Sequence, residues 1–322
     1  MITLDTWKIK TQSEISAKPI KLTYADVYIG NELNPEEGNP NIDDRLKWMK
    51  DFIKQAATSV HTVTYDNNAA QLNVESASNS AVQTYSINEL GNIEISKGRI
   101  LVDATSLLLP ELLYLMLWAN LTNQGFDVMY VEPSSYQEKP YRSKIGSHSL
   151  DYSLSEDGPG LCMLPRYVLP LADSRLVVAL GYEGHRFGSL LSSEEYNKQS
   201  FTGVLGVPPF ELGMEKNSYA KNYSPMDDAR KNYDADFLIT AANDPLQNYQ
   251  LLKTLFQSEG ATLKRNKKMH LAPFGTKPVA LGMAWFAINN RGVSIVYDFV
   301  KKKRMRSIGV GKIHFWRFSV TP

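Results

Sequence analysis

The chain has 322 residues, of which 43% are hydrophobic, and this composition excludes wholesale disorder. Its 35 basic and 34 acidic side chains give a net charge of +1, so the whole molecule lacks the electrostatic field of a dedicated nucleic-acid binder. A single cysteine, Cys162, excludes an internal disulfide and a cysteine-rich zinc site. Because it also favours a reducing compartment, and because the first residues do not resemble a signal peptide, we expect a cytoplasmic protein.

The first third of the chain predicts a small α/β unit. Residues 25–30 have the pattern of a strand, and an amphipathic helix capped by Asp43 follows them. Polar-alternating runs at 70–76 and 81–87 predict an antiparallel hairpin. The pattern changes near residue 98, so residues 1–98 are either a separate N-terminal α/β unit or part of one sheet that continues into a core of residues 99–322.

From residue 99 onward the pattern is that of a Rossmann-like core. An apolar strand, an apolar helix at 107–121 and a second strand form a βαβ unit. The helix is too short to span a membrane and carries Glu111, so we expect it to be buried in a protein without a membrane partner.

Strands and helices alternate to the end of the chain, apart from a long irregular segment at 133–172. That segment suits a lid or a partner-binding element. The predicted fold class is α/β, with a Rossmann-like, mostly parallel sheet, helices on both faces and an antiparallel edge.

Ligands of such sheets collect at the carboxyl ends of the strands, and one candidate there is the sequence "LVDATS". Thr105 or Ser106 is expected to cap the following helix, and Ser106 is also a candidate ligand contact. Asp103 is a carboxylate at the end of a buried strand, so it needs a partner.

A second strand end reads "ALGYEGHRFG" and places several polar groups before a helix. Gly181 ends the strand, while Glu183, His185 and Arg186 open the helix. Two interpretations stay open here. The turn either lies on the surface with a Glu183–Arg186 ion pair, or Gly181 and Arg186 contact an anion.

The sequence "LAPFGTKPVALG" carries the strongest ligand signal. A helix N-terminus presents unpaired N–H groups and a partial positive charge, so a lysine there is unfavourable unless an anion stands in front of it. Gly275 permits close backbone approach, Thr276 can cap, and Lys277 can neutralise a phosphate. The Walker A pattern is absent, and the alternative is that Lys277 points into solvent. At another strand end, Asn243 or Asp244 is expected to cap a helix that begins at Pro245.

The Gly-Thr-Lys-Pro loop at 275–278 resembles the ligand loop of CRISPR-associated Rossmann-fold (CARF) sensor domains, and the related SAVED sensors are similar in plan. The resemblance covers about residues 99–299. The family loop has two glycines before the threonine and lysine, whereas this chain reads "PFGTKP" and has Phe274 in place of the first glycine. It implies that Gly275, Thr276 and Lys277 contact the phosphates of a cyclic or linear oligonucleotide. It also implies a role in prokaryotic antiviral defence, as a homo-oligomer or beside a partner or effector chain, because no nuclease motif is evident.

Three functional hypotheses follow. The first is a non-catalytic sensor or scaffold that binds a nucleotide or oligonucleotide, without a metal or other cofactor. The second is a nucleotide hydrolase or nuclease that uses Asp103 and Glu183, and the third is a partner subunit with a vestigial pocket that docks through 133–172. The densest basic run either forms a solvated hairpin face or contacts nucleic acid directly, and it consists of Lys301, Lys302, Lys303, Arg304 and Arg306.

Overall fold

The chain folds into two compact units, which are described separately. Unit 1 comprises Met1–Gln137 and Arg304–Pro322, and unit 2 comprises Glu138–Lys303. The computed structural model describes residues 2–10, 23–33, 43–78, 81–93, 98–136, 139–140, 150–151, 154–156, 160–171, 174–196, 200–262, 268–302 and 306–320.

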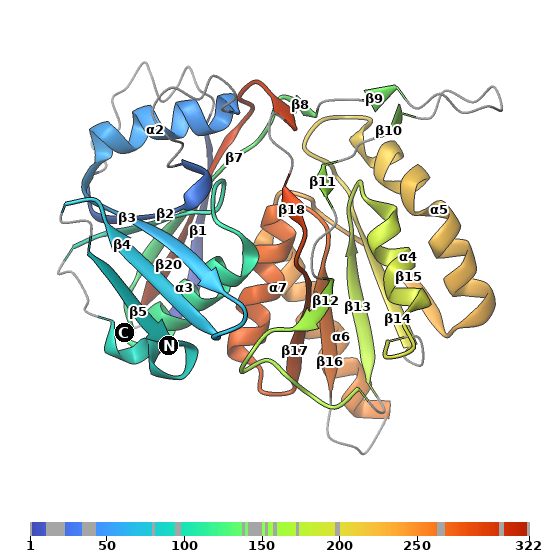
Figure 1. Ribbon diagram of the computed structural model, residues 1–322. Coiled ribbons are helices and arrows are strands. Elements are labelled where there is room, and N and C mark those ends of the chain that lie inside the picture. The colour runs from blue at the N-terminus through green and yellow to red at the C-terminus, as the bar shows by residue number, and fades with distance from the viewer. Residues whose placement is uncertain are drawn as a thin grey trace. The chain divides into compact units, whose positions relative to one another are not determined.

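Unit 1 contains an eight-stranded mixed sheet with the order β1-β20-β7-β6-β2-β3-β4-β5 (Figure 1). The four central strands are parallel, whereas β4, β5 and the β1–β20 pair add antiparallel edges. The strands are β1 (Ile2–Lys10), β2 (Tyr24–Gly30), β3 (Ala57–Asp66), β4 (Gln71–Ser76), β5 (Val82–Ser86), β6 (Ile100–Asp103), β7 (Phe126–Val131) and β20 (Ile313–Val320). The hairpin predicted for residues 70–87 is therefore confirmed as β4 and β5.

Two helices cover opposite faces of this sheet because alternate strand residues point to opposite sides. Helix α2 (Asp44–Ala56) packs its buried stripe against Val27 and Ile29 of β2. Helix α3 (Leu109–Leu121) lies on the other face, where Trp118 contacts the Tyr28 ring edge-on. Short helices η1 (Asn31–Leu33) and η2 (Ile87–Asn92) and the strand pair β8 (Ser135–Tyr136) and β19 (Ser307–Ile308) complete the unit.

Unit 2 contains a six-stranded sheet with the order β12-β17-β16-β13-β14-β15. Its five longer strands are parallel, and β12 adds an antiparallel edge. The strands are β12 (Leu161–Met163), β13 (Arg175–Leu180), β14 (Ser200–Gly206), β15 (Ala235–Thr240), β16 (Met269–Pro273) and β17 (Val293–Asp298). Unit 2 also contains two short strand pairs: β9 (Lys139–Pro140) with β10 (Leu150–Asp151), and β11 (Ser155–Glu156) with β18 (Lys301–Lys302).

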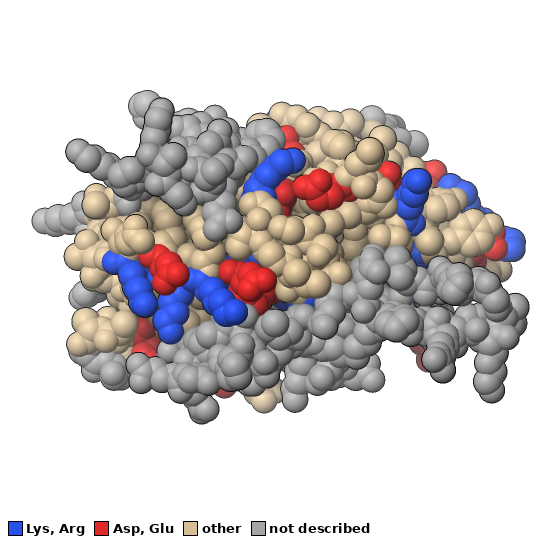
Figure 2. Space-filling model, turned by 90° about the horizontal axis from the view of Figure 1, so that it is seen from above, with Lys and Arg blue, Asp and Glu red and all other residues tan. Residues whose placement is uncertain are grey.

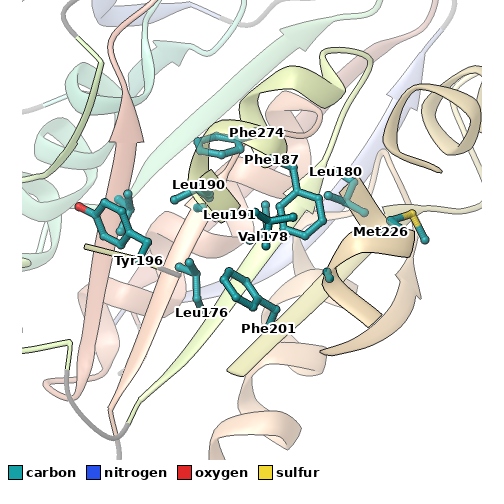
Figure 3. Close-up of a cluster of buried hydrophobic side chains, with 13 residues drawn as sticks. Leu176, Val178, Leu180, Phe187, Leu190, Leu191, Tyr196, Phe201, Met226 and Phe274 are labelled. Atoms are coloured by element: carbon teal, nitrogen blue, oxygen red, sulfur yellow. The ribbon is translucent and has the colours of Figure 1, made fainter. Parts of the chain in front are cut away.

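Four helices connect the parallel strands of unit 2: α4 (Gly184–Ser192), α5 (Met214–Asn232), α6 (Pro245–Thr262) and α7 (Lys277–Asn289). Residues of α4 and α5 share a core with Leu176, Val178 and Leu180 of β13 (Figure 3). Helices α6 and α7 pack on each other through aromatic contacts of Phe286. Because the chain reverses its direction across the sheet after β15, right-handed crossovers place this second helix pair on the opposite face.

The predicted fold class is confirmed, in the form of two mostly parallel sheets that each carry helices and an antiparallel edge. The sequence allowed residues 1–98 to be either a separate unit or part of one continuing sheet, and the division into units does not fall at residue 98. β6 lies directly beside β2, so the chain passes residue 98 within one sheet. Of the predicted lid at 133–172, residues 137–138, 141–149, 152–153, 157–159 and 172 lie outside the described residues, and the described part includes the short strands β8 to β12. No described helix combines the length and apolarity needed to cross a bilayer.

Candidate functional site

The carboxyl ends of β13 and β16 form the topological switch point of unit 2. These two strands are parallel neighbours, but the chain continues from β13 toward β14 on one side and from β16 toward β17 on the other. Helices that leave two such strands diverge, and ligands of open α/β sheets bind in the gap that they leave. Two of the predicted loops therefore meet here, one beginning at Gly181 and the other containing Gly275, Thr276 and Lys277.

Gly181 and Gly275 allow the two loops and strand ends to pack closely against each other. A Cβ atom on Gly181 would lie 2.4 Å from the carbonyl oxygen of Phe274, and one on Gly275 would lie 3.1 Å from the Cβ atom of Ala179. The close backbone approach expected of Gly275 is thus explained by Ala179, without a ligand. Because neither glycine has a Cβ atom, the ends of β13 and β16 can lie this close to each other.

Thr276 occupies the N-cap position of α7, as predicted, but its side chain does not cap the helix. Its hydroxyl donates a hydrogen bond to the carbonyl oxygen of Ala242, in the loop after β15. This bond ties the start of α7 to the start of α6. Lys277 is the first residue of α7 and is partly buried, and the first turn of this helix contains no acidic residue.

Arg186 is held by the carboxylate of Asp298, which is not one of the site residues predicted from the sequence. Its Nε atom lies 2.8 Å from Oδ2 of Asp298, at the end of β17, and its guanidinium lies 4.4 Å from the centre of the Phe274 ring. The Glu183–Arg186 pair, one of the two interpretations of this turn, is therefore not formed. Instead, Glu183 accepts a hydrogen bond from the backbone N–H of Leu154 at 3.1 Å.

Asp298 could have been found by the rule that identified the other candidates. It is the first charged side chain after the apolar residues of β17, and a carboxylate in that position needs a partner. The charges that surround the switch point are consequently mixed. Arg186 and Asp298 neutralise one another, and Lys277 is the predicted phosphate contact at the start of α7.

Ser106 belongs to unit 1, where it lies at that unit's own switch point, between β2 and β6. Its Oγ atom accepts a hydrogen bond from the N–H of Gly30 at 2.8 Å and donates one to Asp103 at 2.5 Å. Thr105 accepts a hydrogen bond from the N–H of Val131 at the end of β7. The expected capping of α3 by Thr105 or Ser106 is wrong, because both hydroxyls instead join the ends of neighbouring strands and Leu108 occupies the N-cap position.

Asp103 finds the partner that its burial requires within its own turn. It is fully buried and accepts hydrogen bonds from the N–H groups of Thr105 and Ser106 as well as from the Ser106 hydroxyl. Burial raises the pKa of this carboxyl group, although those hydrogen bonds lower it in part. A carboxylate enclosed in this way does not reach a substrate in solution, and Glu183, its suggested catalytic partner, belongs to the other unit.

The remaining candidates have structural explanations or lie partly outside the described residues. Asp244 caps α6 by accepting hydrogen bonds from the N–H groups of Leu246 and Gln247, which confirms that prediction. The sequence favours a buried apolar role for Cys162 over a nucleophilic one, and burial raises the pKa of its thiol, which also opposes a nucleophilic role. Within the basic run, Lys303 and Arg304 lie outside the described residues, Lys301 and Lys302 form β18, and Arg306 is partly buried.

Charges are interspersed over the described residues of the face in Figure 2, where basic and acidic side chains lie next to one another. In the described part of the chain, no three His, Cys, Asp or Glu side chains gather as ligands of a metal ion. Comparison with models of known protein families and with curated proteins gave no match. The site is therefore interpreted from its own geometry.

Proposed function

We propose that the protein is a non-catalytic sensor or scaffold that binds a nucleotide or an oligonucleotide at the switch point of unit 2. A phosphate group of this ligand lies at the N-terminus of α7, where Lys277 and the first backbone N–H groups of the helix contact it. The observation that carries the proposal is the position of this lysine, at the start of a buried helix and at the place in the sheet where ligands of this fold class bind.

Helix α2 provides a comparison within the protein. It also has a cation in its first turn, Arg45, and an anion contacts that cation at the start of the helix. Asp43 binds the Arg45 guanidinium through contacts of 2.9 Å and 3.1 Å, and both side chains are buried. In our proposal, the phosphate of the ligand contacts Lys277 in the same way at the start of α7.

Arg186 has a narrower role in this proposal than its sequence position suggested. Because Asp298 neutralises it, Arg186 borders the site and fixes the Phe274 ring, while Lys277 supplies the charge that attracts the phosphate. Three parts of the proposal rest on the resemblance of residues 275–278 to the CARF ligand loop. They are the oligonucleotide ligand, the assembly as a homo-oligomer or with a partner chain, and the role in prokaryotic antiviral defence.

Replacement of Lys277 by alanine tests the proposal directly. Isothermal titration calorimetry would compare the two proteins against mononucleotides, cyclic dinucleotides, cyclic oligonucleotides and short linear oligonucleotides. The binding partners of the wild-type protein should bind Lys277→Ala roughly ten- to a hundredfold more weakly, since a charge-assisted hydrogen bond contributes about 1.5–3 kcal/mol.

Lys253→Ala is the matched control, because it removes the same charge from an exposed position of α6. It should bind as the wild-type protein does. Equal affinities of the wild-type protein and Lys277→Ala for every ligand would reject the proposal.

The hydrolase and nuclease alternatives use Asp103 as a catalytic residue, and the enclosure of this carboxylate by its own turn disfavours that role. Incubation with the same ligands and with nucleic acid, with and without Mg²⁺, would distinguish them. Turnover by the wild-type protein that Glu183→Gln abolishes would favour an enzyme.

A further inference from the structure

A second cluster of charged side chains lies in unit 1, at the amino ends of the parallel strands. Its centre is Asp127 of β7, whose two carboxylate oxygens accept four hydrogen bonds. Arg317 of β20 donates from Nε at 2.8 Å and from Nη2 at 3.0 Å, Arg99 donates from Nη2 at 2.5 Å, and the Tyr24 hydroxyl donates at 3.1 Å. The four residues come from or adjoin the neighbouring strands β2, β6, β7 and β20.

Among the described side chains, the hydrogen bonds of this cluster join two guanidinium groups to one carboxylate, which is one positive charge more than that carboxylate neutralises. Burial alone would raise the pKa of Asp127, but the hydrogen bonds and charges of Arg317 and Arg99 outweigh it and lower the pKa, so the carboxylate is ionised. Burial and the charge of Asp127 raise the pKa of Tyr24, so the phenol stays neutral. Two guanidinium groups and one carboxylate therefore leave a charge of +1.

The arginines of the cluster are accessible, whereas its carboxylate is not. The side chains of Arg99 and Arg317 are 42% and 48% exposed, against 9% for Asp127. The four hydrogen bonds occupy the carboxylate, yet they use only some of the five N–H donors that each guanidinium group has. Arg99 also stacks on the Tyr24 ring at 5.2 Å, which restricts its orientation. The cluster thus presents two oriented guanidinium groups to solvent.

Other arginine–carboxylate contacts of the described residues have a different composition. Arg45 with Asp43 and Arg186 with Asp298 each join one arginine to one carboxylate in a mostly buried, neutral pair, and Arg175 contacts two carboxylates, Asp234 and Asp236. One arginine would also have neutralised Asp127. Because a second guanidinium group at the same carboxylate adds repulsion, an external anion between the two arginines would stabilise the arrangement.

We propose that Arg99 and Arg317 bind an oxyanion of the phosphodiester type, in a site separate from the switch point of unit 2. A phosphodiester carries a single negative charge, which neutralises the cluster, and its two non-bridging oxygens accept hydrogen bonds from two guanidinium groups at once. The phosphodiester belongs either to a small molecule or to the backbone of a nucleic acid, and the experiment below distinguishes these sources.

The first measurement follows the Nε–Hε signals of the arginines by NMR while the full-length protein is titrated with dimethyl phosphate, inorganic phosphate or acetate. Dimethyl phosphate should shift the signals of Arg99 and Arg317 together and saturably, with a Kd in the millimolar range expected of so small an anion. Acetate should shift them less. The exposed Arg291, in unit 2, is the internal control and should not respond.

Arg99→Gln is the decisive variant because it leaves the bidentate Arg317–Asp127 pair and therefore the fold in place. It should weaken the binding of dimethyl phosphate at least tenfold, whereas Arg291→Gln should bind as the wild-type protein does. Unchanged affinity of Arg99→Gln, shifts of Arg99 and Arg317 no larger than that of Arg291, or equal affinity for acetate would each overturn the proposal.

Anisotropy of a labelled single-stranded oligonucleotide identifies the source of the phosphodiester. Two results together would assign the site to a nucleic-acid backbone. The oligonucleotide would bind more tightly than dimethyl phosphate, and its affinity would depend less steeply on salt concentration in Arg99→Gln than in the wild-type protein. Saturable binding of dimethyl phosphate without binding of the oligonucleotide would assign it to a small phosphodiester.

Discussion

At the scale of single residues, His270 shows how burial controls a titratable group. It lies in β16, is fully buried, and forms a hydrogen bond through Nδ1 with the hydroxyl of Ser294 on the adjacent strand β17. Burial, and to a smaller extent the charge of Lys268, lowers the pKa of His270 to about 4. The folded protein therefore keeps this imidazole neutral at pH values where the unfolded chain protonates it.

We expect the free energy of unfolding to fall as the pH decreases from about 6.5 to about 4. In that interval the unfolded chain binds more protons at this position than the folded protein does, so protonation favours unfolding. The full effect is about 3 kcal/mol, from a pKa difference of about 2.5 units.

His270→Gln keeps a hydrogen-bonding side chain but cannot titrate, so it is the matched variant. Urea unfolding at several pH values should show a smaller loss of stability below pH 6.5 in this variant than in the wild-type protein. Identical pH profiles would show that His270 is not responsible.

At the scale of elements, glycine determines how closely helices and loops approach. Gly282 lies in the middle of α7, where a Cβ atom would come within 2.5 Å of the carbonyl oxygen of Pro245 and 2.8 Å of Oδ1 of Asn248, both on α6. The sequence predicts α7 as a buried helix from its apolar residues, but it does not show which helix crosses it at Gly282.

Gly282→Ala should lower the free energy of unfolding by about 1–3 kcal/mol, because the methyl group forces α6 and α7 apart. Gly188→Ala is the matched control, since Gly188 also lies within a helix, α4, but has no atom near the position of the added Cβ. That variant should be more stable by about 0.5–1 kcal/mol. Equal effects of the two substitutions in chemical denaturation would contradict the close crossing of α6 and α7.

At the scale of the whole molecule, the end of the chain completes the sheet of the first unit. β20 lies between β1 and β7 and pairs antiparallel with both. This pairing explains why residues 304–322 belong to the first unit, and the pairing of β2 with β6 carries the same sheet across residue 98, where the sequence pattern changes. Strand order is set by pairing between distant segments, and the local pattern at residue 98 contains no information about it.

A chain that ends at Lys303 lacks β20, so β1 and β7 lose a hydrogen-bonded neighbour. We expect their amide hydrogens to exchange rapidly in this truncated protein, while those of β13 and β16 in the second unit remain protected. Hydrogen-exchange mass spectrometry would measure both. A chain that ends at Val320 retains β20 and serves as the control, and protection of β7 in the shorter chain would refute the expectation.

The sequence by itself determined those features that depend on near neighbours in the chain. The apolar runs of α3 and α7, the alternation of β4 and β5, and the caps Asp43 and Asp244 follow from short-range spacing and from local hydrogen bonds. These patterns also located the turns at which polar groups follow buried strands. They were sufficient to predict the fold class and the loop that contains Lys277.

Only the tertiary structure decided which groups these turns meet. Arg186 binds Asp298, 112 residues away, and the Ser106 hydroxyl accepts its hydrogen bond from Gly30, 76 residues away. The physical reason is that a buried polar group must find a partner, but the order of the strands selects that partner. For the same reason, two arginines that are far apart in sequence share Asp127 and form a cluster that no local motif indicates.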